Sequence, residues 1–424
     1  MDQGRLTLIR HHQMNKVSTS YPRSKIKILL LENISDSAVD EFSKSGYAEV
    51  QRLSGALTED RLVKAVRGVH LIGIRSKTRI TRNVIDAADK LLAIGCFCIG
   101  VNQVDLKAAT EKGVAVFNAP YSNTRSVAEL IIGLAVVLIR RIAEKNEAAH
   151  RGLWLKEAKG SYELRGKTLG IIGYGNIGSQ VSIMAEALGM KVIYYDIATK
   201  LPHGNAKQIS DLKELISRSH IVTLHVPANA TTRNMINTDI LRSFKKGACF
   251  LNYSRGDVVD LKALKKALSS GKLAGAAVDV FPHEPEKKGD VFTSELQNLP
   301  NVILTPHIGG STEEAQAHIG LDVTAKLIKY LELGTSEGSY TVPPVSLPPQ
   351  AGTHRILHIH RNVPGVLGEI NSRLSSHGIN IVGQYLNTNP DIGYVILDVE
   401  SKLSKQAFAL LKDVPGTLKA RVVY

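Results

Sequence analysis

The sequence predicts an α/β protein with two parallel-sheet units, followed by a small C-terminal domain of βαββαβ order. Three observations support this fold class. Apolar strand-like runs alternate with helical patterns up to about residue 330. A glycine-rich turn joins one of these strands to a helix, and residues 354–424 contain four strand patterns and two helical ones. A length of 424 residues agrees with about three domains at roughly 150 residues each.

Composition places the chain among ordinary globular proteins. Hydrophobic residues make up 43% and charged residues 22%, and no apolar run reaches the roughly 18 residues of a membrane span. The cysteines Cys96, Cys98 and Cys249 lie in apolar strand-like runs, which disfavours a disulfide framework and indicates a reducing, cytoplasmic location. No second Cys/His pair completes a zinc set, so no metal site is predicted.

The net charge of +14 is unevenly distributed. Residues 1–27 contain six basic residues and one acid, which gives +5 of the total. The rest is scattered through mixed-charge helices, so no nucleic-acid or membrane partner is predicted. Residues 1–24 have no apolar core typical of a secretory signal. They are interpreted as a flexible basic extension, and organelle targeting remains an alternative.

The first unit begins at Lys25. The runs KIKILLLEN, VHLIGIRS, LLAIGCFCIG and VAVFNAP predict parallel strands with intervening helices. Helical spacing from Asn123 to about His150 predicts one long helix that leaves this unit. A second helix, from about Thr312 to Tyr330, is long enough to return to it, so we expect a discontinuous, flavodoxin-like domain over residues 25–122 and 310–333.

The second unit, residues 123–309, opens with a nucleotide fingerprint. The strand TLGII runs into Gly173-x-Gly175-x-x-Gly178 and then a helical pattern, and the next strand ends at Asp196, 18 residues after Gly178. Glycines allow a tight turn and close approach of the backbone to a pyrophosphate, which the helix N-terminus stabilises. Asp196 favours NAD over NADP because its carboxylate would repel a 2′-phosphate, although Lys200 lies nearby in the sequence.

Four more strands, HIVTLHVP, ACFLNYS, GAAVDVF and NVILTPH, complete a doubly wound Rossmann sheet. Residues 334–352 are rich in Pro, Ser and Gly and are predicted to form a linker. Residues 353–424 then follow the order strand, helix, strand, strand, helix, strand, which is the ferredoxin-like arrangement.

Three polar motifs follow strands of the nucleotide unit, where open α/β sheets place ligands. They contain Arg255, Glu284 and His307. Oxidation of an alcohol by nicotinamide needs a base for the hydroxyl proton, a group that raises the pKa of that base, and a cation for a substrate carboxylate. His307, Glu284 and Arg255 meet these needs in turn. Each alone is typical of a cap, a solvated carboxylate or a turn-borne charge, but together they indicate a site.

The motifs GYGNIG, NYSRG, GAAVDVFPHEP and TPHIGGST, with Asp196, resemble the D-isomer-specific 2-hydroxyacid dehydrogenases over residues 25–335. Residues 353–424 resemble an ACT regulatory domain. The resemblance implies a substrate-binding first domain and an NAD-binding second domain. It also implies NAD-dependent oxidation of 3-phosphoglycerate to 3-phosphohydroxypyruvate, the first step of L-serine biosynthesis, with Arg255, Glu284 and His307 catalytic.

The resemblance carries over further residues by motif. The family often has His where Asn176 stands, so an altered NAD affinity is the largest effect expected of Asn there. The implied nucleotide contacts are Gly173, Gly175, Asn176, Ile177, Gly178, Asp196, Tyr253, Ser254, Arg255, Asp279, His307, Ile308, Gly309 and Gly310. The implied substrate contacts are Arg75, Ser76, Lys77, Asn123, Trp154 and Lys156, with Arg125 also a candidate. In relatives, the segment with Trp154 and Lys156 reaches the neighbouring subunit's site.

His360, Asn362 and Asn380 match the serine-binding positions of ACT domains that provide feedback inhibition. Arg361 and Val363 depart from the family's commoner sequence, so the match predicts serine binding without predicting the strength of inhibition. From the residues alone, Asn362 is a turn residue and Asn380 lies where a strand begins. Relatives are tetramers, and an ACT domain with an open sheet edge commonly pairs with a copy of itself, so a homotetramer is expected.

Two other functions remain open at this stage. A dehydrogenase of the same superfamily acting on glyoxylate or hydroxypyruvate would share the catalytic residues, and some relatives also reduce 2-oxoglutarate. An NAD-sensing corepressor or scaffold would share the fold and the basic charge, because a fold alone does not fix a function. The ACT-like segment and the basic residues near Arg75 favour a phosphorylated substrate over the first alternative. The intact set of catalytic residues disfavours the second.

Overall fold

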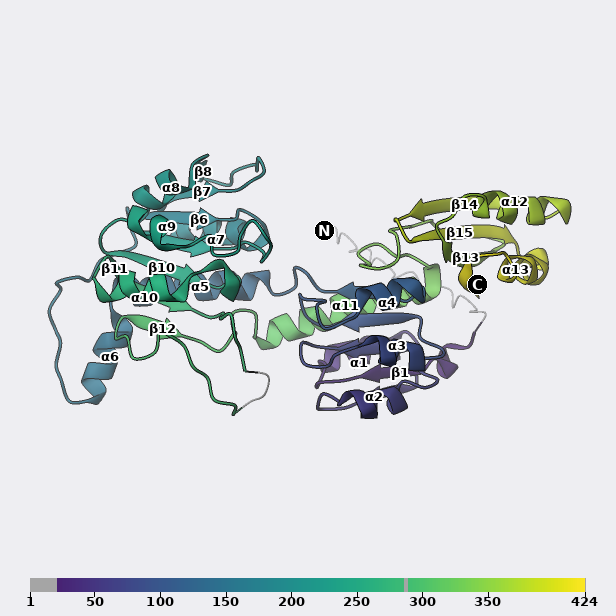
Figure 1. The fold of residues 1–424 in the computed structure, drawn as a ribbon, viewed down its shortest axis with the longest axis horizontal. Coiled ribbons are helices and arrows are strands. Elements are labelled where there is room, and N and C mark those ends of the chain that lie inside the picture. Colours follow the sequence, from purple (N-terminus) through teal and green to yellow (C-terminus); the bar gives the residue numbers. More distant parts are fainter. Residues whose placement is uncertain (1–20, 286–288, 424) are drawn as a thin grey trace, which may run out of the picture. The chain divides into compact units, whose positions relative to one another are not determined.

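The computed structural model describes residues 21–285 and 289–423, so most of the predicted N-terminal extension lies outside the described residues. The chain forms two compact units, and the first is discontinuous in sequence. It comprises the residues up to Pro120 together with Ala317 onwards, and the second comprises Tyr121–Gln316. Figure 1 shows the elements of each unit.

The first unit contains a five-stranded parallel sheet in the order β2-β1-β3-β4-β5. Alternate residues of the strands face two helical layers, one with α1 and α11 and the other with α2, α3 and α4. The strands are β1 (Ile28–Leu30), β2 (Val50–Arg52), β3 (Leu71–Ile74), β4 (Ala93–Cys96) and β5 (Ala115–Asn118). The helices are α1 (Asp36–Lys44), α2 (Glu59–Ala65), α3 (Arg82–Ala87), α4 (Leu106–Glu111) and α11 (Glu313–Leu333).

The second unit contains a seven-stranded parallel sheet in the order β12-β11-β10-β9-β6-β7-β8. Helices α5 and α7 pack on one face, and α8, α9 and α10 on the other. The strands are β6 (Thr168–Ile172), β7 (Lys191–Tyr195), β8 (Lys207–Gln208), β9 (Ile221–Leu224), β10 (Ala248–Asn252), β11 (Leu273–Val278) and β12 (Val302–Leu304). The helices are α5 (Thr124–Ile139), α7 (Asn176–Ala187), α8 (Leu212–Arg218), α9 (Thr238–Ser243) and α10 (Leu261–Ser269).

The C-terminal segment forms an antiparallel sheet in the order β14-β15-β13-β16, with two helices over one face. Its elements are β13 (Thr353–Arg361), α12 (Val366–Ser376), β14 (Ile381–Thr388), β15 (Ile392–Glu400), α13 (Ser404–Lys412) and β16 (Thr417–Val423). This is the βαββαβ order expected from the sequence. Together with the two parallel sheets, it confirms the predicted fold class.

The single helix predicted from Asn123 to His150 is wrong. Helix α5 ends at Ile139, and α6 (Ile142–His150) begins after Arg141, which has a left-handed backbone (φ 55°). Burial differs on the two sides of the break: eight side chains of α5 are buried, whereas only Ala148 is buried in α6. The guanidinium of Arg141 forms two hydrogen bonds with the Glu144 carboxylate, at 2.8 and 2.7 Å. These bonds close the first turn of the second helix.

Residues 334–352 have no regular secondary structure, yet they are held against β5. The Tyr340 N–H donates to the Val116 carbonyl at 2.9 Å. The Thr341 hydroxyl donates to the Val114 carbonyl at 2.7 Å and accepts from the Val116 N–H at 3.0 Å. These bonds satisfy backbone groups on the edge of the sheet, which would otherwise be open to pairing.

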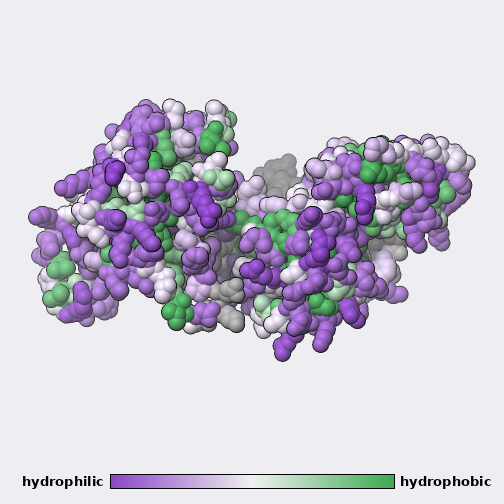
Figure 2. Space-filling model, in the orientation of Figure 1, coloured by the Kyte–Doolittle hydropathy of each residue, from purple (hydrophilic) through white to green (hydrophobic). Residues whose placement is uncertain are grey.

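No helix among the described residues is long and apolar enough to cross a membrane. The visible face in Figure 2 is mostly hydrophilic, with scattered hydrophobic residues. Exposed apolar side chains do gather in the irregular segment after α6, where Leu153 and Trp154 are 53% and 86% exposed.

Candidate active site

Arg255, Glu284 and His307 follow three neighbouring strands of the second unit. Arg255 lies after β10, Glu284 after β11 and His307 after β12, and these strands pair directly in parallel. Parallel strands end at the same edge of a sheet, so the three side chains lie at its carboxyl edge. The contact that joins two of them is short: Nδ1 of His307 lies 2.7 Å from Oε2 of Glu284.

This contact sets the ionisation of both groups. The hydrogen bond to Glu284 is the main cause that raises the pKa of His307, and partial burial opposes it. Burial raises the pKa of Glu284, but the hydrogen bonds from His307 and from the Phe281 N–H outweigh it, so the pKa is lowered. Arg255 acts on both groups through its charge and lowers both pKa values. The pair therefore favours a carboxylate beside a histidine that readily accepts a proton.

The backbone around His307 is held in an uncommon conformation by Asp279. His307 has φ 54°, in the left-handed region, and its N–H donates to the Asp279 carbonyl at 2.9 Å. The buried Asp279 carboxylate accepts from the N–H groups of Ile308 and Gly309, both at 2.8 Å, and from the Thr305 hydroxyl at 2.5 Å. Three bonds to one carboxylate fix the loop that presents the imidazole.

The turn after β10 is fixed in a similar way. The Asn252 amide donates to the Arg255 carbonyl at 3.1 Å, and its oxygen accepts from the N–H and hydroxyl of Ser254. A Cβ at Gly256 would lie 2.1 Å from the carbonyl carbon of Phe281, so this glycine allows the β10 and β11 turns to approach closely. The Arg255 guanidinium donates to the Ser254 carbonyl at 2.7 Å.

The glycine fingerprint forms the turn between β6 and α7. Gly173 has φ 93°, and a Cβ there would lie 2.4 Å from the His225 carbonyl oxygen. A Cβ at Gly178 would lie 2.2 Å from the carbonyl oxygen of Gly173, whereas one at Gly175 would meet nothing within 4 Å. The turn is thus closed toward the protein at Gly173 and Gly178 and open at Gly175, where α7 begins. This shape fits a pyrophosphate held at a helix N-terminus.

Asp196 lies directly after β7, as a ribose-binding acid should. Its Oδ2 accepts from the Tyr174 N–H at 2.8 Å, and its Oδ1 accepts from the Ala198 N–H at 3.0 Å. These bonds fix the carboxylate and leave lone pairs for ribose hydroxyls. Asn176 is exposed in the first turn of α7. The residues of this turn and Asp196 therefore fit NAD.

Comparisons with known proteins agree with this geometry. Residues 132–309 match the D-isomer specific 2-hydroxyacid dehydrogenase, NAD binding domain, and residues 356–419 match the AHAS small subunit-like ACT domain. D-3-phosphoglycerate dehydrogenase of Haemophilus influenzae is 51% identical over 97% of this chain and 100% of its own length. That of Dictyostelium discoideum is 49% identical over 96% and 99%.

The chain belongs to the D-3-phosphoglycerate dehydrogenases of the D-isomer-specific 2-hydroxyacid dehydrogenase family. Solved structures share the fold of about three quarters of the chain. The TT0316 protein of Thermus thermophilus is similar with a TM-score of 0.64 at 33% identity, covering 72% of this chain and 97% of that one. A D-lactate dehydrogenase of Aquifex aeolicus, complexed with NAD and lactic acid, has a TM-score of 0.63 at 25% identity over 75% and 100%.

The candidate substrate residues of this dehydrogenase are divided between the two units. Arg75, Ser76 and Lys77 follow β3 in the first unit, and Ser76 and Lys77 are exposed. Asn123 lies at the start of α5 in the second unit, where its buried Oδ1 has no hydrogen-bond partner. A Cβ at Gly310 would lie 2.0 Å from Nδ2 of Asn123, so this glycine makes room for the amide.

Arg125, Trp154 and Lys156 are all exposed in the second unit. Arg125 pairs with Glu129 one turn along α5, at 2.6 Å. Trp154 and Lys156 lie in the irregular segment after α6, and Trp154 is 86% exposed. Most of its indole surface is thus available to another molecule.

The candidate effector residues lie at different places in the ACT domain. His360 is buried opposite Gly393 of β15, and the Asn362 amide donates to the Asn389 carbonyl at 2.8 Å. Asn380 directly precedes Ile381, which pairs with Val399, whereas His360 pairs with Gly393. About six residues of β15 therefore separate the levels of Asn380 and His360. At about 3.4 Å per residue this is roughly 20 Å. One chain therefore does not bring His360 and Asn380 together.

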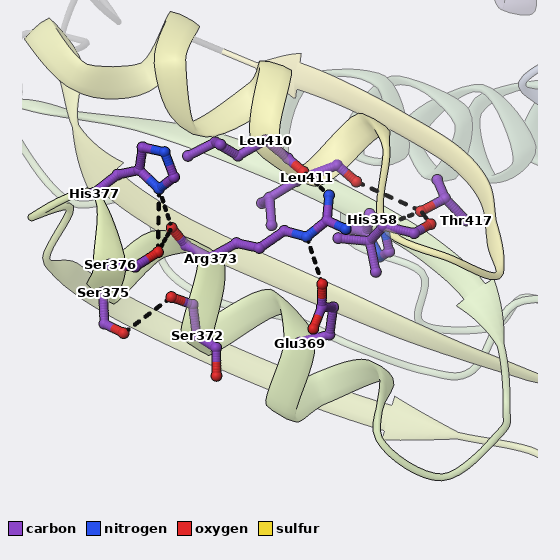
Figure 3. A network of polar contacts seen from close by, with 11 residues as sticks. His358, Glu369, Ser372, Arg373, Ser375, Ser376, His377, Leu410, Leu411 and Thr417 are labelled. Atoms are coloured by element: carbon purple, nitrogen blue, oxygen red, sulfur yellow. Dashed lines mark hydrogen bonds and ion pairs between the residues drawn. The ribbon is translucent and has the colours of Figure 1, made fainter.

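A chain of hydrogen bonds through His358 and Thr417 fixes the tautomer of His360, and Figure 3 shows the contact of His358 with Thr417. The Thr417 hydroxyl donates to the Val414 carbonyl at 2.6 Å, so it accepts from Nε2 of His358 at 2.8 Å. Burial and the neighbouring His360 lower the pKa of His358 to about 4, which keeps His358 neutral. Its Nδ1 then accepts from Nδ1 of His360 at 3.3 Å. Nε2 of His360 is left as an acceptor.

Sequence patterns do not reveal several residues that hold these sites. Thr305 bridges Tyr253 and Asp279, at 2.9 and 2.5 Å, and nothing in its strand-end position distinguishes it from an ordinary β-branched residue. His358 alternates with His360 along β13, so a shared face could have been inferred from period 2. The contact of His358 with Thr417 joins positions 59 residues apart, so it could not have been inferred from the sequence.

Proposed function

We propose that this chain oxidises 3-phospho-D-glycerate to 3-phosphohydroxypyruvate with NAD, the first step of L-serine biosynthesis. The observation that carries the proposal is the 2.7 Å pair of His307 and Glu284 at the same sheet edge as Arg255. Identity of 51% over the full length of a D-3-phosphoglycerate dehydrogenase supports the choice of substrate.

The proton chemistry follows from the geometry of the pair. Glu284 holds Nδ1–H of His307, so the neutral imidazole presents Nε2 as the base for the substrate hydroxyl. As the O–H proton passes to Nε2, the adjacent carboxylate stabilises the imidazolium. Arg255 holds the substrate carboxylate through its guanidinium. NAD held at the glycine turn and Asp196 would supply the acceptor for the hydride of the carbinol carbon, and His307 takes the hydroxyl proton, so the oxidation is balanced.

We assign substrate positioning to Asn123 and to the loop of Arg75, Ser76 and Lys77. The unpartnered Oδ1 of Asn123 is a buried acceptor that needs a donor, which a substrate hydroxyl provides. Arg75, Ser76 and Lys77 supply two cations and a hydroxyl for the phosphate. The exposed Trp154 and Lys156 suit a segment that contributes to the site of a neighbouring copy. We propose a homotetramer in the cytoplasm.

L-Serine is the proposed effector, bound between two ACT domains. His360 and Asn362 of one copy and Asn380 of another would form one site. Within one chain, Asn380 is separated from His360 by roughly 20 Å along β15, so it cannot complete the site of its own chain. The tautomer of His360 presents an acceptor at Nε2, which suits the ammonium or hydroxyl group of an amino acid.

The substrate is tested by comparing kcat/KM for 3-phosphoglycerate with kcat/KM for unphosphorylated D-glycerate. The rate is measured by the absorbance of NADH. We expect a strong preference for the phosphorylated acid, and equal values would overturn the proposal. Glyoxylate, hydroxypyruvate and 2-oxoglutarate tested in the reductive direction separate the enzyme from related dehydrogenases. A chain that binds NADH and turns over none of these acids would instead be a sensor or scaffold.

The test of the effector is calorimetry with L-serine on the intact chain and on Asn362→Ala. We expect heat from the intact protein and a much weaker response from the variant. Heat of the same size from both would exclude Asn362 from the site. If neither protein gives heat, serine is not the ligand of the ACT domain.

A further inference from the structure

Glu32 is a buried carboxylate directly behind the loop that carries Arg75, Ser76 and Lys77. It follows β1, the strand that pairs with β3, and it is 8% exposed. Glu32 has φ 61°, a left-handed backbone that its N–H stabilises by donating to the Gly55 carbonyl at 3.2 Å. The turn directs the side chain from the end of one strand to the loop after its neighbour.

Both carboxylate oxygens bind backbone N–H groups of that loop. Oε1 accepts from Thr78 at 2.8 Å and from Arg75 at 3.1 Å, and Oε2 accepts from Lys77 at 3.0 Å. Hydrogen bonds to a charged acceptor are about twice as strong as neutral ones. One carboxylate therefore determines the path of four consecutive residues.

A second side chain holds the loop through a carbonyl group. Nε2 of Gln103 donates to the Arg75 carbonyl at 2.9 Å and to the Gly100 carbonyl at 3.2 Å. Gln103 is also 8% exposed. Glu32 holds the donors of the loop and Gln103 holds an acceptor, so the backbone is fixed from both sides.

This arrangement decides which groups are left for a substrate. Backbone N–H groups in a turn commonly form a concave anion site. Here the N–H groups of Arg75, Lys77 and Thr78 already bind the anion of Glu32 and face the protein interior. Ser76 and Lys77 have exposed side chains on the other side of the loop. Side chains of this loop are therefore the groups proposed to bind a phosphate, and their direction depends on the backbone that Glu32 holds.

We propose that Glu32, assisted by Gln103, is a positioning residue that determines preference for a phosphorylated substrate. It acts through the loop and does not touch the substrate. This inference rests on the proposed function, in which Arg75, Ser76 and Lys77 bind the phosphate group. The role is specific to binding of that group, so proton transfer at His307 and binding of NAD do not depend on it.

The test is steady-state kinetics of the full-length enzyme carrying Glu32→Gln, with 3-phosphoglycerate and D-glycerate as substrates. The neutral amide has only one oxygen acceptor and turns an NH2 group toward backbone donors. We expect KM for 3-phosphoglycerate to rise by about tenfold to a hundredfold, the range that corresponds to loss of charged hydrogen bonds. KM for NAD and kcat should stay within about threefold, and kcat/KM for D-glycerate should change little.

Glu59→Gln is the matched control. Glu59 also accepts hydrogen bonds within the first unit, from the side chains of Thr81 at 2.7 Å and Asn83 at 3.0 Å at the start of α3, but not from the residues proposed to bind phosphate. The Glu59→Gln variant should have the same ratio of kcat/KM for 3-phosphoglycerate to kcat/KM for D-glycerate as the unmodified enzyme. A general loss of stability would affect both substrates equally and would not change this ratio.

The outcomes separate the two proposals. If the unmodified enzyme prefers 3-phosphoglycerate and Glu32→Gln keeps that preference, the role of Glu32 is overturned and the proposed function stands. If the unmodified enzyme shows no preference, the phosphate assignment fails and the inference fails with it. If Glu32→Gln does not fold, Gln103→Met is used in its place. Met has a side chain of similar size to Gln but cannot donate a hydrogen bond to the Arg75 carbonyl. An unchanged substrate ratio in that variant overturns the proposal.

Discussion

Replacing Glu284 with Gln tests whether this carboxylate raises the pKa of His307, the proposed base. The hydrogen bond from Glu284 is the main cause that raises the pKa of His307, and the amide removes the charge at nearly constant size. Loss of that bond lowers the pKa of His307. In the proposed mechanism oxidation needs the neutral imidazole, so kcat/KM should rise with pH as His307 loses its proton. The acid limb of the profile should therefore move to lower pH in Glu284→Gln.

The size of the rate effect follows from the exposure of the pair. A hydrogen bond to a charged group contributes about 1.5–3 kcal/mol. The side chains of His307 and Glu284 are 53% and 35% exposed, so screening by water places this bond at the lower end, about 1.5–2 kcal/mol. The bond strengthens as the imidazole becomes charged during proton uptake. Its loss should lower kcat/KM by about tenfold to thirtyfold on the alkaline side of the profile.

The assay is kcat/KM for 3-phosphoglycerate as a function of pH, for the unmodified chain, Glu284→Gln and the control Glu314→Gln. Glu314 is exposed in the first turn of α11, and its replacement should leave both the limb and the plateau unchanged. An acid limb that stays in place or moves to higher pH in Glu284→Gln would refute the reasoning. A fall in the plateau without any shift would show that Glu284 positions the imidazole without setting its ionisation.

Three further changes test other parts of the structure. His307→Asn should abolish turnover and leave the affinity for NADH, measured by fluorescence, within about twofold; a matching loss of NADH binding would contradict a role confined to proton transfer. Gly178→Ala places a Cβ 2.2 Å from the Gly173 carbonyl oxygen, so it should cost about 1–3 kcal/mol in urea unfolding and weaken NADH binding. Asp398→Asn leaves the buried Arg355 without its 2.7 Å ion pair and should cost about 3–5 kcal/mol, whereas a change below about 1 kcal/mol would show that this pair is solvated.

The nucleotide unit could be predicted from the sequence because its signals are local. The glycine turn and Asp196 can each be recognised because they directly follow a predicted strand. Parallel strands end at the same edge of a sheet, so these motifs are expected to lie near one another. The break at Arg141 could not be predicted. Apolar residues continue on both sides of it, and only burial shows that α5 packs while α6 does not.

Contacts between distant segments account for most of what the sequence does not show. Glu32 reads as one more acid after a buried strand, and its role depends on a loop more than 40 residues away. Arg355 reads as a charged residue in a strand. Its guanidinium binds Asp398 and the carbonyls of Leu333, Leu347 and Pro348, which joins the end of α11, residues 334–352 and the ACT sheet. Such partners depend on the pairing of whole elements.

The roles of the two acids near His307 illustrate the same limit. Asp279 and Glu284 both follow β11, and both raise the pKa of His307, so motif order does not separate them. The Asp279 carboxylate already accepts three hydrogen bonds from the loop after β12 that carries His307. Glu284 places Oε2 at 2.7 Å from the imidazole. Asp279 therefore fixes the backbone that carries His307, and Glu284 binds Nδ1 of the imidazole and leaves Nε2 for the proposed proton transfer.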